Sequence, residues 1–259
     1  MLVQRAGEER KDLLSVVILG SGGRAPSVAR ETACVLVREQ KRALLLDAGT
    51  GLRRLIADRT HIAGVDRLDV VLTHFHFDHV CGLPFLPLLE VQATIWAPGR
   101  WLYGTPSAAI LEPLRRPPVA PDDVTAVYPV RELEADEQTV GGFAVRASPQ
   151  PRHWAASAGL RVDDQLALIT DTAYEPTSAA LAAGVPHLLH EAWSTSSAPR
   201  YPDKDSTAAD AGRVAREAEV GQLTLIHIDS QLPDPSILLA DAADAFDRVS
   251  LGVDEMVLG

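Results

Sequence analysis

The segment Thr73–Gly82, THFHFDHVCG, places four potential metal ligands within six residues: His74, His76, Asp78 and His79. They begin where the apolar strand pattern LDVVLTH ends. Histidine nitrogens and carboxylate oxygens are usual ligands of zinc. A His-rich surface loop is the alternative, but VVL before the cluster and GLPFLPLL after it are typical of a core, where unpaired polar groups are costly. Taken alone, the segment predicts a site for one metal ion.

Three further candidates lie far along the chain, each just after an apolar strand pattern. His153 follows a strand and a Pro-containing turn, Asp171 ends QLALIT, and His227 ends QLTLI. Any one of them alone is equally well read as a solvated loop residue. Their shared position at strand ends favours a common site. The four residues of the local cluster do not complete the coordination of two metal ions, and these three residues would supply the missing ligands.

The order of the elements predicts a layered α/β fold. Apolar residues make up 46% of the 259 residues, which is enough for a sizeable core, and no internal repeat or long linker divides the chain. Strands come first and a helix follows, and this pattern occurs twice. Thr207 and Asp210 form a candidate capping box at the start of a helix. The expected strands include 15–20, 33–39, 43–49, 68–74, 93–98, 123–130, 165–172, 187–193 and 222–228, and the expected helices include 51–59, 207–220 and 237–246.

Charge and composition narrow the partners and the location. The net charge is −11, from 24 basic and 35 acidic residues, which disfavours a nucleic-acid partner because Lys and Arg contacts to phosphate dominate that affinity. Residues 1–12 are polar, lack the apolar region of a signal peptide and are expected to form a loose lead-in. No apolar run has the length of a membrane span. Cys34 and Cys81 are expected to be reduced residues in a soluble cytoplasmic protein.

Several motifs resemble the metallo-β-lactamase superfamily over nearly the whole chain. They are HFHFDH, His153, TDT with Asp171, and IHI with His227. The branch of ribonuclease Z-like phosphodiesterases is the most similar one, through ILGSGG, LLDAGTGL, DHVCGLP, LLHEA, STAADAG and LIHID. The resemblance implies a four-layer αββα sandwich, formed by residues 1–259 as a single domain, with a dinuclear metal site at one edge of the sheets.

The resemblance also implies a set of ligands. His74, His76 and His153 would hold the first metal, Asp78, His79 and His227 the second, and Asp171 would bridge them. Asp47 in LLDAG would orient a ligand histidine, although a turn aspartate before glycine is the alternative. The cofactors would be two divalent ions, with zinc the first choice and manganese or iron also suited to His/Asp ligation.

Such a site would hydrolyse its substrate with a metal-bridging hydroxide, which Asp78 would orient or deprotonate. The resembled branch assists the leaving group with a Glu, matched by Glu191, and with a His before a Ser-Thr pair. Asp205 stands in place of that His, so it would need a raised pKa to donate a proton, for example by pairing with Glu191. His190 is a second source of an imidazole, although on a strand it would point opposite to Glu191.

In the resembled branch, the members that process tRNA carry a flexible basic arm that grips the tRNA, and no candidate for such an arm is found here. The substrate is therefore expected to be a small phosphodiester similar to a cyclic nucleotide. The alternatives are tRNA 3′-processing, hydrolysis of an ester, lactone or thioester, and a non-catalytic binding module on the same fold. Trp154 is the best candidate for a pocket wall, whereas Trp96, Trp101 and Tyr103 are more typical of packing. A homodimer with a contribution from LPFLPLL is expected only by analogy.

Overall fold

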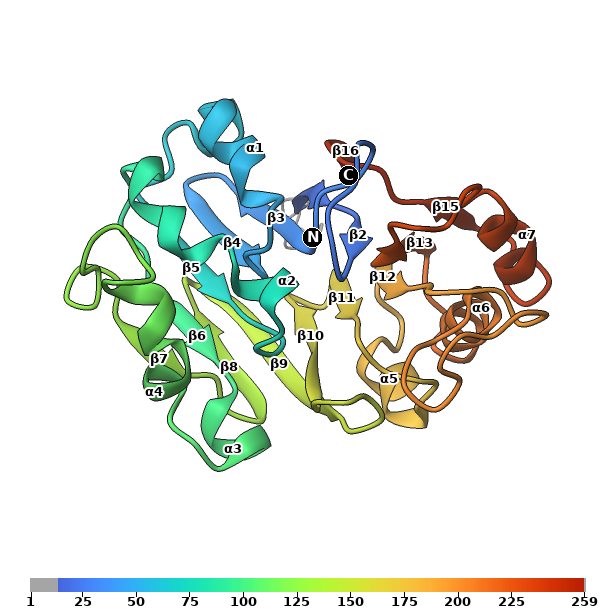
Figure 1. Cartoon of the computed structure of the whole chain (residues 1–259). Helices are drawn as coiled ribbons and strands as arrows, with labels where there is room; N and C mark the ends of the chain where they lie inside the picture. The colour runs from blue at the N-terminus through green and yellow to red at the C-terminus, as the bar shows by residue number, and fades with distance from the viewer. Residues whose placement is uncertain (1–13, 259) are drawn as a thin grey trace, which may run out of the picture.

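Two large β-sheets form the centre of the computed structural model, which describes residues 14–258 (Figure 1). The expected lead-in at residues 1–12 lies outside the described residues. Within residues 14–258 each large sheet has seven strands, and β2 (Gly22–Gly23) pairs with β14 (Ile228–Asp229) in a small third sheet. The first large sheet has the order β16 (Met256–Leu258), β1 (Ser15–Gly20), β3 (Cys34–Glu39), β4 (Arg42–Leu46), β5 (Arg67–Val71), β6 (Ile95–Ala97) and β7 (Val130–Glu132). The second has the order β15 (Val249–Leu251), β13 (Gln222–Ile226), β12 (His187–Glu191), β11 (Leu166–Ile169), β10 (Ser157–Val162), β9 (Phe143–Gln150) and β8 (Asp136–Val140).

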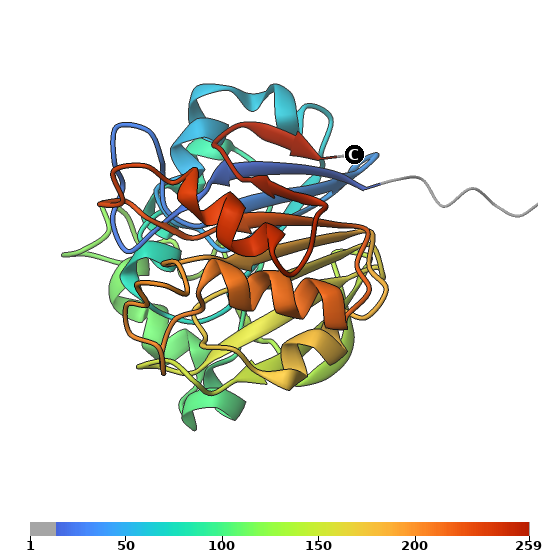
Figure 2. The same ribbon diagram turned by 90° about the vertical axis from the view of Figure 1, so that its right-hand side faces the viewer.

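Helices cover the outer face of each sheet, so the fold is the expected αββα sandwich. The second sheet is covered by α5 (Pro176–Leu181), α6 (Ala208–Glu217) and α7 (Ile237–Ala243), which Figure 2 shows in front of the strands. The first sheet is covered by α1 (Leu52–Ala57), the 3-10 helices η1 (Arg59–Ile62) and η2 (Leu83–Leu89), and α2 (Phe77–Val80). Between β6 and β7 lie α3 (Gly99–Tyr103), α4 (Ser107–Leu111) and the 3-10 helix η3 (Glu112–Arg115).

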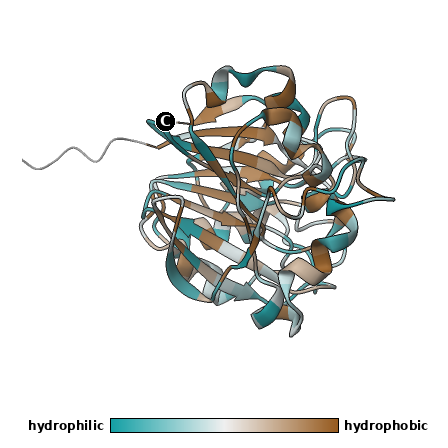
Figure 3. Ribbon diagram, turned by 90° about the vertical axis from the view of Figure 1, so that its left-hand side faces the viewer, coloured by the Kyte–Doolittle hydropathy of each residue, from teal (hydrophilic) through white to brown (hydrophobic). Residues whose placement is uncertain are grey.

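The strands form as they do because both faces of each sheet are buried. In β4, Leu44 and Leu46 pack between the two sheets while Leu45 packs under the helices of the first layer. Alternate side chains of a strand point to opposite faces, so burial on both sides requires an uninterrupted apolar run. Figure 3 shows these hydrophobic strands in the middle of the molecule. None of the helices within residues 14–258 has the length and apolar character required to cross a membrane.

Of two local predictions from the sequence, the capping box of a helix is confirmed and the position of a strand is wrong. The Thr207–Asp210 capping box at the start of α6 is present with both reciprocal hydrogen bonds. The strand expected at 123–130 is wrong, because only β7 is a strand and the residues before it form turns. Asp123 accepts hydrogen bonds from the backbone N–H and the hydroxyl of Thr125, which stabilises the turn, while Arg115 donates to the carbonyl groups of Thr125 and Tyr128.

Parallel pairing brings the ends of five strands to one edge of the sandwich. Strand β4 pairs parallel to β5, and β11, β12 and β13 are parallel neighbours. The residues that follow or end these strands are Asp47, His74, Asp171, Glu191 and His227. The carboxyl ends of parallel strands lie at the same edge of their own sheet. His79 contacts both Asp47 and His227, so the two edges meet and positions as distant as 47 and 227 lie in one region.

Asp254 ties the segment before β16 to the glycine turn after β1. Its side chain is 4% exposed. One carboxylate oxygen accepts from the N–H and the hydroxyl of Ser21, at 2.9 and 2.7 Å, and the other accepts from the N–H of Glu31 at 2.7 Å and from Arg54 at 3.0 Å. These contacts hold together segments that are 200 to 233 residues apart in the chain. Removal of this carboxylate would leave several buried donors without an acceptor.

We therefore expect Asp254→Ala to lower the free energy of unfolding by about 3 kcal/mol, because buried charged groups that lose their partner are strongly destabilising. The measurement is the urea midpoint at constant m-value. Asp66→Ala, at an exposed aspartate, is the matched control and should change stability by less than about 0.5 kcal/mol. Equal effects of the two substitutions would contradict the assigned role of Asp254.

Candidate metal centre

The edge of the sandwich gathers all seven ligand candidates expected from the sequence into two groups that could hold metal ions. Within each group the potential ligand atoms lie within 4.8 Å of one another. One group contains His74, His76, His153 and Asp171, and the other contains Asp78, His79 and His227. Asp171, Glu191 and His227 form a third such combination, which overlaps both. Residues from the local cluster and from three distant strand ends therefore meet at one place.

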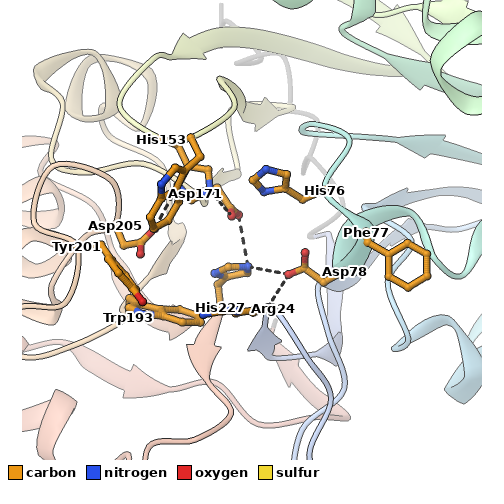
Figure 4. A pocket seen from close by; sticks show the side chains of 11 residues that line it. Arg24, His76, Phe77, Asp78, His153, Asp171, Trp193, Tyr201, Asp205 and His227 are labelled. Atoms are coloured by element: carbon orange, nitrogen blue, oxygen red, sulfur yellow. Dashed lines mark hydrogen bonds and ion pairs between the residues drawn. The ribbon is translucent and has the colours of Figure 1, made fainter.

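Asp171 lies between the two groups, and each of its carboxylate oxygens faces a different one. Figure 4 shows its ion pair with His227. Oδ1 is 3.7 Å from His74 Nε2 and 3.4 Å from His153 Nε2. Oδ2 is 3.2 Å from His79 Nε2 and 3.4 Å from His227 Nε2. This is the arrangement expected of a carboxylate shared between two cation sites.

Hydrogen bonds on the far side of the rings fix the first group. Thr73 Oγ1 lies 3.0 Å from His74 Nδ1, and the carbonyl oxygen of Lys204 lies 2.9 Å from His153 Nδ1. The ring of His76, which is half-buried, packs edge-on against both, with centroid distances of 4.5 and 5.1 Å. Contacts to the outer nitrogen orient a ligand histidine and leave its inner nitrogen for a metal.

The second group is fixed in the same way. His79 Nδ1 is 2.8 Å from Asp47 Oδ2, so the expected contact of Asp47 with a histidine of the cluster is confirmed. Asp47 also accepts from the N–H and the hydroxyl of Thr73, which joins the two groups. Asp78 Oδ2 accepts from the backbone N–H of Arg24 at 2.6 Å and lies 3.4 Å from His227 Nε2.

Backbone strain accompanies these contacts. The backbone of Asp47, Asp171 and His227 has positive φ values of 58°, 55° and 50°, which residues other than glycine rarely adopt. A residue in this conformation costs of order 1–3 kcal/mol and persists only where the surrounding structure enforces it. Gly23 is required beside His227, because a Cβ there would lie 2.5 Å from the imidazole Cε1. The fold accepts this strain at three of the residues that form the cluster.

Burial and charge set the protonation of the cluster. Burial lowers the pKa of His74 well below its ordinary value, so its ring is neutral at pH 7. Burial also opposes the charged forms of His79 and His227, but the carboxylates of Asp171 and Asp78 outweigh it and raise the pKa of both rings well above the ordinary value. Burial alone would raise the pKa of Asp171, yet the surrounding imidazolium rings hold it well below its usual range.

The donor set fits divalent cations. His74 Nε2 is fully buried and has no hydrogen-bond partner among residues 14–258. The Nε2 atoms of His79 and His227 lie only 3.2 Å apart and face the same carboxylate oxygen of Asp171. Like imidazolium charges this close are unfavourable. Cations placed among these nitrogens and carboxylate oxygens would satisfy the lone pairs and replace the protons.

Two candidates for leaving-group assistance have different contacts from those expected. Asp205 lies 3.1 Å from His153 Nδ1 and lines the cavity, so it contacts a ligand candidate. Glu191 is fully buried and accepts from the N–H groups of Asp171, Thr172 and Ser206, while its Oε2 lies 3.4 Å from His227 Nδ1. Burial raises the pKa of Glu191, and the nearby Asp171 and Asp205 add to this effect against the influence of His227.

His190 is the one proposed catalytic residue that the structure leaves outside the site. Neighbours on the same face of β12, such as Leu188, belong to the core beneath α5, α6 and α7. The ring is fully buried, its Nδ1 bonds to the carbonyl of Glu191, and burial lowers its pKa to about 4. Adjacent residues of a strand point to opposite faces, so His190 points away from the side on which Glu191 contacts His227. His190 therefore does not reach the cavity that His227 lines.

A cavity of about 440 Å³ opens above the two groups. Trp154 lines it as expected, and Trp96, Trp101 and Tyr103 do not. The cavity is also lined by Arg24, Phe77, Trp193 and Tyr201, which the sequence did not indicate. Arg24 follows the GSGG turn, and that glycine turn was the only local signal of a loop approaching the site.

Comparisons with known proteins agree with this geometry. The family model described as "Metallo-beta-lactamase superfamily" matches residues 28–219. A protein named Ribonuclease Z from Bradyrhizobium sp. (strain ORS 278) is 28% identical, and the alignment covers 93% of this chain and 98% of that relative. The solved structure of the metallo-β-lactamase fold protein YhfI from Bacillus subtilis matches with a TM-score of 0.78 and 19% identity, covering 95% of this chain and 99% of YhfI. A diphosphatase of the PhnP family matches with a TM-score of 0.73 and 16% identity, covering 95% and 97%.

The two structural matches support the fold, and the family model identifies the family because it spans most of the chain. The described residues provide the His and Asp groups that such a protein needs to hold metal. The chain therefore belongs to the metallo-β-lactamase superfamily and is a metal-dependent hydrolase.

Proposed function

We propose that the protein is a dinuclear metallohydrolase that cleaves small phosphodiesters similar to cyclic nucleotides. The observation that carries this proposal is the carboxylate of Asp171, whose two oxygens face two separate groups of ligands at the base of one cavity. His74, His76 and His153 would hold one ion, Asp78, His79 and His227 the other, and Asp171 both. Two divalent ions bound there would supply a water activated at neutral pH and stabilise charge on the attacking and leaving oxygens.

Asp78 is placed to control the attacking water. Its Oδ2 is held by the N–H of Arg24 and by His227, which leaves Oδ1 to accept a hydrogen bond from that water. The Gly22–Arg24 turn thus positions the carboxylate through the backbone. In the reaction, water would attack phosphorus, the bond from phosphorus to the leaving oxygen would break, and Asp78 would orient the water for this attack.

Glu191 and Asp205 are proposed to act through the residues that they contact. Glu191 holds the backbone of Asp171 and Thr172 with its carboxylate and lies behind His227, so it fixes the bridging residue in its strained conformation. Asp205 lies behind His153. Carboxylates in these positions orient ligand histidines and increase their basicity. The attacking water would lose its proton to solvent, and solvent water would protonate the leaving oxygen.

The cavity and its charge favour a small anionic substrate. A volume of about 440 Å³ lies within the range of roughly 300–1,000 Å³ typical of small-molecule sites. Arg24 lines the cavity, and its guanidinium has no ion pair with the residues in 14–258. We propose that this guanidinium binds the non-bridging oxygens of the phosphodiester with charge-assisted hydrogen bonds.

The second candidate function is tRNA 3′-processing, and the observation in its favour is the 28% identity to a protein named Ribonuclease Z along nearly the whole chain. The net charge of −11 argues against it, since a polyanion would be repelled outside the cavity. Zinc as the resident metal, homodimerisation and a cytoplasmic location stay predictions from the sequence.

Replacement of the bridging carboxylate tests the dinuclear site. Asp171→Ala should abolish phosphodiester hydrolysis and reduce the metal content from about two ions per chain to one or fewer, because both groups lose a shared ligand. Elemental analysis of the purified protein measures the metal, and circular dichroism checks the fold. Asp122→Ala, at an exposed loop position, is the matched control and should leave both quantities unchanged. Unchanged turnover in Asp171→Ala would refute the assignment.

Metal binding should release protons. The carboxylates of Asp171 and Asp78 raise the pKa values of His79 and His227 in the metal-free cluster, and a ring nitrogen has to give up its proton to bind a cation. Zinc affinity should therefore rise with pH and fall as the pH is lowered. Calorimetric zinc titrations of the chelator-treated chain, in buffers of different ionisation enthalpy, count the released protons. A binding enthalpy that is independent of the buffer would contradict this protonation state.

Replacement of Arg24 should affect the hydrolysis of phosphodiesters and not that of neutral esters. Arg24→Asn removes the cation, and asparagine tolerates the positive φ of 62° at this position. The KM of an aryl phosphodiester should rise roughly ten-fold, whereas hydrolysis of a neutral aryl ester or lactone should not change. The wild-type protein loaded with zinc or manganese is assayed on the same substrates, on a cyclic nucleotide and on a precursor tRNA. Activity on the tRNA alone would favour the second candidate, and activity on the ester alone would refute phosphodiester hydrolysis.

A further inference from the structure

Trp154 and Tyr201 form an aromatic corner at the mouth of the cavity, and we propose that this corner binds the planar heteroaromatic base of a nucleotide substrate. Both residues line the cavity, and their rings meet edge-on with centroids 5.0 Å apart. The inference rests on the proposed function and extends it, because it names the part of the substrate that lies beyond the phosphodiester. Neither residue takes part in the metal cluster.

The position of the corner is fixed by the cluster. The ring of Trp154 packs edge-on against that of His153, with a centroid distance of 5.0 Å, and His153 Nε2 is 3.4 Å from Asp171. A nucleotide whose phosphate lies at the base of the cavity and whose sugar lies beside His153 places its base against Trp154 and Tyr201.

The exposure of these rings is unusual for residues whose role is packing. Trp154 is 58% exposed and Tyr201 is 44% exposed, although large aromatic side chains normally bury most of their surface. Tyr201 also has a positive φ of 55°, so the loop accepts a strained conformation at this residue. A nucleobase stacked on such a surface would cover apolar area and gain affinity without the need for a specific edge contact.

The charges around the cavity favour this occupant over an apolar molecule. Arg24 provides a cation for a phosphate, and it lines the same cavity as the aromatic corner. Figure 4 shows Tyr201 and Trp193 on one side of the cavity and Phe77 on the other, with His227 and Asp78 between them. A ligand that combines an anionic phosphate with a planar apolar ring matches both features.

The test is equilibrium binding of a matched pair of ligands, AMP and ribose 5-phosphate, which differ by the base. Isothermal titration calorimetry is performed on the full chain with its metals, so that no turnover is needed. We expect AMP to bind at least about ten-fold more tightly, because stacking of one base on aromatic side chains contributes a factor of roughly 5 to 150. Trp154→Leu and Tyr201→Leu should each reduce this preference, and Trp154→Phe should retain part of it. Both positions are exposed, so these changes should leave the fold intact.

Phe85→Leu is the matched control, since Phe85 is 50% exposed and does not line the cavity. It should leave the AMP preference unchanged. Equal affinities for the two ligands, a preference that survives both leucine variants, or no measurable AMP binding would overturn the aromatic subsite. Failure of the proposed function has a different signature, because it would appear as absent phosphodiester hydrolysis in the wild type even where the AMP preference is present.

Discussion

The shared carboxylate of Asp171 is the contact on which the organisation of the site depends. Its Oδ1 faces His74 and His153, which follow β5 and β9. Its Oδ2 faces His79 in α2 and His227, which follows β13. Its backbone N–H is held by Glu191 and its Oδ2 also accepts from the hydroxyl of Thr170. Because these partners come from both large sheets, the carboxylate can take this position only when the sandwich is assembled.

The scaffold stabilises a local arrangement that is costly by itself. Left-handed backbone at Asp47, Asp171 and His227, together with buried charge, would not persist in an isolated loop. Parallel strands bring these residues to one edge, and the hydrogen bonds of Glu191 and Asp47 fix their orientation. Stability and function are thereby coupled, as expected where a rigid framework holds a polar cluster in the geometry that a cation requires.

The sequence predicted the layers and the position of the metal-ligand candidates at one edge of the sheets, because both depend on strands buried on two faces. Apolar runs such as QLALIT mark such strands, and polar residues directly after them can only lie at the sheet edge. The predicted strand at 123–130 was wrong because Asp123 and Arg115 stabilise turns through contacts that composition does not reveal. Arg24 and Tyr201 were missed because their approach to the cavity depends on loop conformations with positive φ. The pairing of Asp205 with His153 likewise depends on tertiary packing of a loop.

The proposed bridging of two metal ions by Asp171 can be tested by anomalous diffraction from crystals of the metal-loaded protein, recorded on both sides of the metal absorption edge. We expect two anomalous peaks, one among His74, His76 and His153 and the other among Asp78, His79 and His227, with the carboxylate of Asp171 between them. A single peak coordinated by Glu191 with Asp171 and His227, or no peak beside Asp171, would contradict it.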